Sequence, residues 1–148
     1  MTPNTPQPDG SYIVHAGMMI DGDGSPRCSA PLGSNLDALD YLANAGKPGH
    51  WWGLACDKSG VPYIQGSTAP VFNSASEGFY VSTTSLVRPG YADNDPMHYI
   101  NAETERYVVV PRFFQRTVKG IVLGCKCLVS YKDKTVEAVV ADIGNDFG

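Results

Sequence analysis

VLGCKCLVSYKDKTVEAVVADIG, at residues 122–144, carries the clearest structural signal in the chain. Both halves of this stretch are rich in apolar and β-branched residues, which suit a pleated and half-buried surface. Between them lies YKDKT, at residues 131–135, which has the composition of a hairpin turn. We therefore expect an antiparallel hairpin whose two strands lie within residues 119–132 and 134–144.

The second strand of this hairpin reaches an acid, Asp142, just where the sequence turns from apolar residues to DIGND. Asp, Gly and Asn favour turns, so a buried strand is expected to emerge into a loop at this point. Two interpretations of Asp142 remain open. It caps the turn, or it is a carboxylate that a rigid strand end holds in place for chemistry. Asp146 lies four positions further on, so the two residues form a cluster of carboxylates in the sequence.

The remaining segments also predict a mainly β fold. Five more have strand composition and are separated by turn residues: 11–20, 50–57, 61–66, 78–87 and 106–114. About seven short strands with one helix are typical of a barrel or a sandwich.

The single predicted helix covers residues 34–46, where leucines recur at helical spacing and Gly46 ends the pattern. The polar, proline-rich residues 1–10 are expected to form a flexible N-terminal arm. Residues 11–148 then make a single β-rich domain.

Composition excludes several classes of function. The 148 residues carry 15 acids against 11 lysines and arginines, a net charge of −4, which argues against a nucleic-acid partner. No apolar run reaches the roughly 18 residues that a membrane-spanning helix needs. The first residues lack the basic and apolar segments of a secretion signal.

The cysteines do not have the spacing of a zinc site, so no metal or cofactor is expected. Three readings stay open for them: small core residues, one disulfide such as Cys28 to Cys56, or a metal site. Cys125 and Cys127 are expected to point to one face of a strand, because side chains alternate with a period of two.

The acidic run DGDG contains Asp21 and Asp23 and resembles the start of a calcium loop. However, proline and leucine stand where later ligands would be needed, so calcium is not expected. Paired carboxylates are also the groups that cleave glycosidic bonds. Aromatic rings that stack on sugars often accompany such groups, and the candidates are Trp51, Trp52, Tyr80, Tyr91 and Tyr99.

Three motifs together resemble the chitosanases of glycoside hydrolase family 75: MMIDGDGSPR at 18–27, YVVVP at 107–111, and the stretch quoted first. Their order and rough spacing match from Met18 to the end of the chain. The resemblance implies an endo-acting hydrolase that cuts β-1,4-linked glucosamine polymers with inversion. It further implies a six-stranded double-psi β-barrel core with long loops and one or two short helices.

By this resemblance Asp142 takes the place of a catalytic acid, with Asp21 as a second acid in the cleft. The residues expected to bind the polysaccharide are Asp23, Trp51, Trp52, Tyr80 and Tyr91. The family's own second carboxylate, a glutamate, lies just beyond the position that matches Gly148. We therefore expect a domain that is incomplete at its C-terminus and inactive alone, with a second chain or segment supplying the glutamate.

An incomplete barrel would leave the Val-rich strand at 134–144 with a missing neighbour, and such an edge favours self-association. The alternative function is a carbohydrate-binding or structural module on the same fold, for example in a virus particle or secretion device. An unrelated cysteine-dependent or metal protein is a third reading. The sequence does not give a location, although a wall polymer would imply extracellular or particle-associated action.

Overall fold

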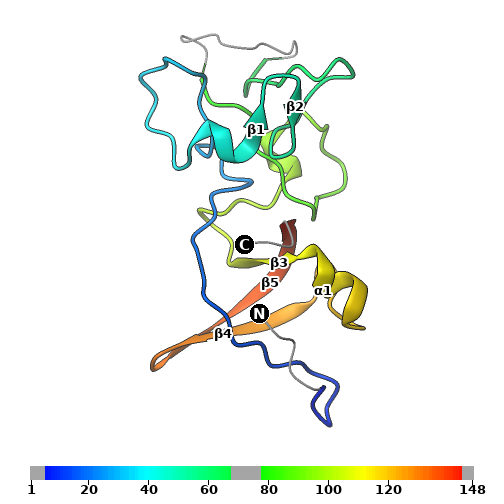
Figure 1. Cartoon of the computed structure of the whole chain (residues 1–148). Coiled ribbons are helices and arrows are strands. Elements are labelled where there is room, and N and C mark those ends of the chain that lie inside the picture. The colour runs from blue at the N-terminus through cyan, green and yellow to red at the C-terminus, as the bar shows by residue number, and fades with distance from the viewer. Residues whose placement is uncertain (1–5, 68–77, 145–148) are drawn as a thin grey trace.

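The computed structural model describes residues 6–67 and 78–144 and is mainly β, with only short helices. Figure 1 shows an elongated molecule with two parts: a loop-rich part (residues 21–67 and 78–105) and a sheet part (residues 106–144). The elements of the loop-rich part are η1 Leu42–Ala45, β1 Gly46–Lys47, β2 His50–Trp51 and η2 Pro96–His98. The elements of the sheet part are β3 Tyr107–Pro111, α1 Arg112–Thr117, β4 Lys126–Tyr131 and β5 Lys134–Gly144.

The sheet part is built around β5. This strand pairs with β3 in parallel and with β4 antiparallel, so the order is β3-β5-β4. The predicted hairpin is therefore confirmed, and β5 has the bounds that the sequence indicated. At its turn Lys132 adopts a left-handed backbone with φ of 55°. Figure 1 shows the far end of β5 directed toward the loop-rich part.

The Val-rich strand was expected to lack a neighbour, and its pairing changes along its length. Residues 134–139 of β5 pair with β4, and residues 139–144 pair with β3 through YVVVP at 107–111. Among the described residues, Val139 has a strand partner on each side, whereas Val136 has one only in β4. Self-association through the open side of β5 therefore stays a prediction.

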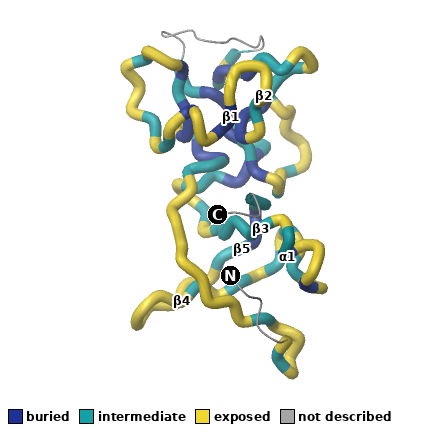
Figure 2. Tube along the Cα trace, in the orientation of Figure 1, coloured by how far each residue is buried: buried dark blue, intermediate teal, exposed yellow. Residues whose placement is uncertain are grey.

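The loop-rich part is held by short antiparallel contacts. Isolated bridges join Leu54 to Ser82, Cys56 to Pro62 and Ile64 to Tyr80. They enclose two buried clusters, one of Leu42, Ala45, Leu54, Ile64 and Tyr80, the other of Ala55, Val81 and Tyr99. Figure 2 shows the buried residues concentrated here, whereas the β4–β5 hairpin is largely exposed.

The helix predicted over residues 34–46 is largely absent, and only η1 forms inside that range. The backbone N–H groups of Leu39 and Asp40 donate instead to the carbonyls of Arg27 and Cys28, at 2.9 and 3.0 Å. This pairing uses donors that a helix would need. Of the three leucines in the pattern, Leu42 packs in the first core cluster, whereas Leu36 and Leu39 are 37% and 48% exposed.

Two predicted strands are also revised. Residues 11–20 run as an exposed extended segment in which only Val14 makes a bridge, because no strand lies alongside them for the rest of their length. The strand predicted over 106–114 ends at Pro111, and α1 follows. The helix is favoured there because it turns Phe114 inward, and Val118, one turn further on, is buried as well.

The described strands form a two-stranded and a three-stranded sheet and do not close into a barrel. Residues 6–10 of the predicted arm form a turn in which Gly10 N–H donates to the Gln7 carbonyl at 2.9 Å. Within the described part of the chain, no helix combines the length and apolar character that crossing a bilayer requires.

Candidate active site

Three acids that are far apart in the sequence meet where the two parts of the molecule join. Asp21 and Asp23 lie on the loop that opens the loop-rich part, and Asp142 lies near the end of β5. Their closeness shows in the titration of Asp23. Burial, followed by the negative charges of Asp21, Asp142 and Asp40, raises the pKa of Asp23 from 3.8 to about 7. Burial, opposed by a hydrogen bond from Asp23 N–H and reinforced by Asp142, raises the pKa of Asp21.

Hydrogen bonds hold the Asp23 loop in place. Asp23 N–H donates to Asp21 Oδ1 at 2.9 Å, which closes a tight turn. The Tyr107 hydroxyl on β3 donates to the Asp23 carbonyl at 2.7 Å. Ser82 Oγ donates to Asp23 Oδ1 at 3.4 Å, and Cys28 Sγ lies 3.8 Å from the same oxygen. Among the described residues, no cation pairs with the carboxyl group of Asp23, and burial together with the neighbouring carboxylates favours its neutral form.

Asp142 is fixed in a different way. Its Oδ1 accepts from Ser85 N–H at 2.9 Å, from Ile143 N–H at 2.8 Å and from Ser85 Oγ. Next to this contact, Leu86 N–H donates to the Ala141 carbonyl at 2.8 Å. Among the described residues none donates to Asp142 Oδ2. The carboxylate is thus oriented by one oxygen and keeps the other for a ligand or water.

Ser85 and Gly24 are site-building residues that the sequence did not reveal. Ser85 follows a bridge-forming strand segment, and nothing in its neighbourhood signals a contact with residue 142. Gly24 has φ of +74°, and a Cβ atom there would lie 2.0 Å from the Ile100 carbonyl oxygen and 2.7 Å from Thr84 Cγ2. A glycine directly after an acid could have suggested close packing, but it does not name the partner.

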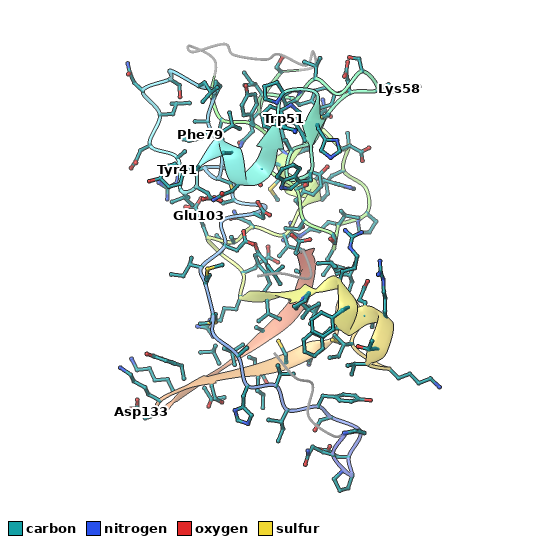
Figure 3. All side chains as sticks on the ribbon, viewed as in Figure 1. Tyr41, Trp51, Lys58, Phe79, Glu103 and Asp133 are labelled. Atoms are coloured by element: carbon teal, nitrogen blue, oxygen red, sulfur yellow. The ribbon has the colours of Figure 1, made fainter. Side chains whose placement is uncertain are left out.

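A cavity of about 210 Å³ lies beside Asp21. The residues that line it are Ile20, Asp21, Gly22, Leu39, Asp40, Ala102 and Glu103. Glu103 forms an ion pair with Arg27 at 2.6 Å and accepts a hydrogen bond from Ser25 Oγ at 2.5 Å. Figure 3 places Glu103 at the boundary between the two parts. Asp21 and Asp40 therefore give this cavity its negative charge.

The aromatic candidates divide into two groups. Trp52 is 57% exposed, and its Nε1 donates to the Asn44 carbonyl at 2.7 Å. Asn44 Nδ2 in turn donates to Asp40 Oδ1 at 2.7 Å, so this ring is tethered to a residue that lines the cavity. Trp51 is half-buried and packs against the first core cluster.

Tyr91 is 43% exposed on the loop that precedes η2. The prediction that Tyr80 binds substrate is wrong, because its side chain is fully buried at 0% exposure in the first core cluster. Tyr99 is likewise a core residue, at 6% exposure. Aromatic identity alone does not separate these positions from the exposed ones. Asp146 lies outside the described residues.

A disulfide between Cys28 and Cys56 and a metal site were two of the interpretations left open for the cysteines. All four cysteines are free thiols, so the Cys28–Cys56 disulfide is not formed. In the ranges 6–67 and 78–144, no group of three or more His, Cys, Asp or Glu side chains is arranged to hold a metal ion. Burial raises the pKa of Cys28 to about 11, so this thiol stays protonated beside Asp23.

Comparison with known proteins adds no identification, because neither a protein-family model nor a curated protein matches the chain.

Proposed function

We propose that this protein is a glycoside hydrolase that cleaves β-1,4 bonds in an amino-sugar polymer. One observation carries the proposal: Asp23, whose pKa of about 7 leaves about half of it protonated at neutral pH, lies within the electrostatic field of an oriented carboxylate, Asp142. Two carboxyl groups held in different environments are what acid–base cleavage of a glycosidic bond requires.

The roles follow from these environments. Asp23 acts as the general acid and gives its proton to the leaving glycosidic oxygen as the bond from the anomeric carbon breaks. Asp142 acts as the general base: its Oδ2, to which no described residue donates, takes a proton from water, and the water oxygen bonds to the anomeric carbon. Asp21 is a positioning residue: its charge favours the protonated form of Asp23, and its Oδ1 accepts from Asp23 N–H, which fixes the turn.

This assignment modifies what the resemblance implied. The sequence placed Asp23 among substrate-binding residues and Asp21 as the second catalytic acid, with a further glutamate expected beyond residue 148. Both catalytic roles can instead be filled by groups within the described residues. Inversion at the anomeric carbon and the double-psi barrel remain part of the proposal, because they rest on the shared motifs alone.

The substrate class follows from charge. Glucosamine units carry an ammonium group at neutral pH, and the cavity beside Asp21 presents this carboxylate and that of Asp40. Opposite charges in a partly desolvated cavity favour binding. The exposed ring of Trp52 supplies a flat apolar surface for a sugar of the same chain.

Product analysis tests the proposed function. The protein is incubated separately with chitosan, chitin and peptidoglycan, and soluble oligosaccharides are separated by mass. We expect products from chitosan in preference to the two acetylated polymers, because only chitosan has a free amine on most units. Cleavage of chitin or peptidoglycan alone would contradict the assigned substrate class.

The exposed ring of Trp52 also favours a second candidate function, a carbohydrate-binding module without catalysis. Such a module would bind chitosan through Trp52 and release no oligosaccharides. The same incubation separates the two functions when bound protein is measured by co-sedimentation with the polymer.

The titration of Asp23 gives a prediction that does not depend on activity. The folded state holds this proton up to pH of about 7, against 3.8 for an ordinary aspartate. The folded state therefore binds more protons than the unfolded state between these values, and its stability falls as pH rises through this window. Urea unfolding from pH 4 to 8 should show this loss. Asp23→Asn should reduce the slope, whereas Asp133→Asn, at the exposed hairpin tip, should leave it unchanged.

Trp52→Ala is expected to weaken chitosan-oligomer binding by roughly 1 to 3 kcal/mol, the range for aromatic stacking on a flat ligand. Isothermal titration calorimetry on an inactive background measures the change. Tyr41→Ala is the matched control, because Tyr41 is another exposed aromatic in the same part of the chain, at 82% exposure. Equal losses in both variants would show that the Trp52 ring has no specific role.

A further inference from the structure

Cys125 and Cys127 form a pair of thiols on one face of the sheet, and the proposed hydrolysis does not use them. Burial alternates along this segment: Cys125, Cys127 and Val129 are half-buried, whereas Lys126 and Leu128 between them are exposed. This period of two shows that both cysteines point to the covered face. The other two cysteines, Cys28 and Cys56, lie in the loop-rich part.

The ladder with β5 fixes the surroundings of the pair. Cys127 lies opposite Ala138, and the Cys125 carbonyl accepts from Val140 N–H at 2.9 Å. Val140 is only 3% exposed, and Ala138 is half-buried. The thiols therefore sit against apolar side chains on a rigid strand pair, with limited access for water.

Strand geometry decides which chemistry the pair can support. Cys125 directly precedes β4, and Cys127 is the second residue of that strand. At the extended spacing of about 3.3 Å per residue, their Cβ atoms are about 6.6 Å apart, whereas a disulfide needs about 3.5–4.5 Å. Both thiols are free, as this spacing predicts. A copper(I) ion held in line between two sulfurs needs an S···S span of about 4.4 Å, at about 2.2 Å for each bond, and each side chain reaches it by leaning about 1 Å toward the other.

The number and type of ligands select the metal. Tetrahedral zinc needs four ligands, and the part of the chain that the structure describes has no cluster of even three. Soft thiolates prefer copper(I), for which two sulfur ligands in line are sufficient.

We propose that Cys125 and Cys127 form a two-coordinate site for copper(I). On binding, each thiol releases one proton and two Cu–S bonds form, which leaves one net negative charge and changes no oxidation state. Because both thiols must lose a proton to bind the metal, copper affinity should increase as pH rises. The proposal is independent of the hydrolase function.

The test is an anaerobic titration of the reduced protein with copper(I) bicinchoninate, in which loss of the coloured complex reports transfer. We expect one copper(I) bound per chain. Cys125→Ser and Cys127→Ser should each weaken binding on the order of 100-fold, because each removes one of two ligands. The double variant Cys28→Ser/Cys56→Ser is the matched control and should retain wild-type affinity. Wild-type affinity in both Cys125→Ser and Cys127→Ser, or loss in the control, would overturn the site.

X-ray absorption of the copper-loaded wild-type protein makes the test independent of how the variants fold. Two sulfur neighbours at about 2.2 Å and no other first-shell ligand are expected for a two-coordinate thiolate site. A shell of three sulfurs, or one containing nitrogen or oxygen, would contradict the proposal.

Discussion

Asp142→Asn is expected to abolish hydrolysis and leave the fold intact. The amide cannot take a proton from water, and loss of a general base typically costs about 100- to 10,000-fold in rate. The fold should persist because the amide oxygen still accepts from Ser85 N–H and Ile143 N–H. We expect a melting temperature within about 4 °C of wild type, which corresponds to less than about 1 kcal/mol. Initial rates on chitosan and thermal unfolding by circular dichroism measure the two effects.

Asp133→Asn provides the matched control for this variant. It makes the same chemical change on the same sheet, but Figure 3 shows Asp133 at the tip of the β4–β5 hairpin, away from the junction of the two parts. Its rate should equal that of wild type. If Asp142→Asn instead lowered the melting temperature strongly and kept its activity, Asp142 would be a turn cap, the simpler of the two interpretations of the sequence.

Gly24→Ala is expected to destabilise the protein strongly, by roughly 4 kcal/mol or more, which is exceptional for a single methyl group. The added Cβ would lie 2.0 Å from the Ile100 carbonyl oxygen, a backbone atom that cannot rotate away. The residue also has φ of +74°, which a side chain disfavours. Because Gly24 follows Asp23 directly, any relief of the clash moves the acid. Urea unfolding should therefore show the loss of stability, and activity should fall with it.

Gly33→Ala separates the clash from the backbone effect. Gly33 has a similar φ of +78°, but nothing lies within 4 Å of its Cβ position. It should cost only about 1 to 2 kcal/mol, the penalty of a left-handed backbone for an L-residue. Equal losses at the two positions would mean that the contact with Ile100 is not what makes Gly24 necessary.

The hairpin of the sheet part was predictable because its signal is local. In YKDKT and the strand at 134–144, turn chemistry and β-branched residues agree with the final pairing, so the bounds of β5 match. The prediction of a helix over 34–46 was wrong because of a long-range contact. The backbone N–H groups of Leu39 and Asp40 donate to the carbonyls of residues 27–28. Apolar spacing cannot show that a distant segment competes for the same donors.

The candidate site shows the same division. The residue types and motifs pointed to Asp21, Asp23 and Asp142, and the fold does gather them. Their roles could not be read from the sequence, because burial and three neighbouring charges set the proton affinity of Asp23. Ser85 holds Asp142 from a segment far away in the chain, and no local pattern marks it. Tyr80 was predicted to bind substrate because residue type alone does not distinguish an aromatic side chain in the core from one on a binding surface.

We propose that Asp23 and Asp142 together cleave a β-linked amino-sugar polymer with inversion. Proton NMR of chitosan during incubation with the protein tests this proposal, because the anomeric signals of new reducing ends appear before they equilibrate. We expect the α-anomer to form first, and neither anomer to form with Asp142→Asn. Initial formation of the β-anomer would contradict inversion, and unchanged chitosan in the presence of bound, folded wild-type protein would contradict the hydrolase itself.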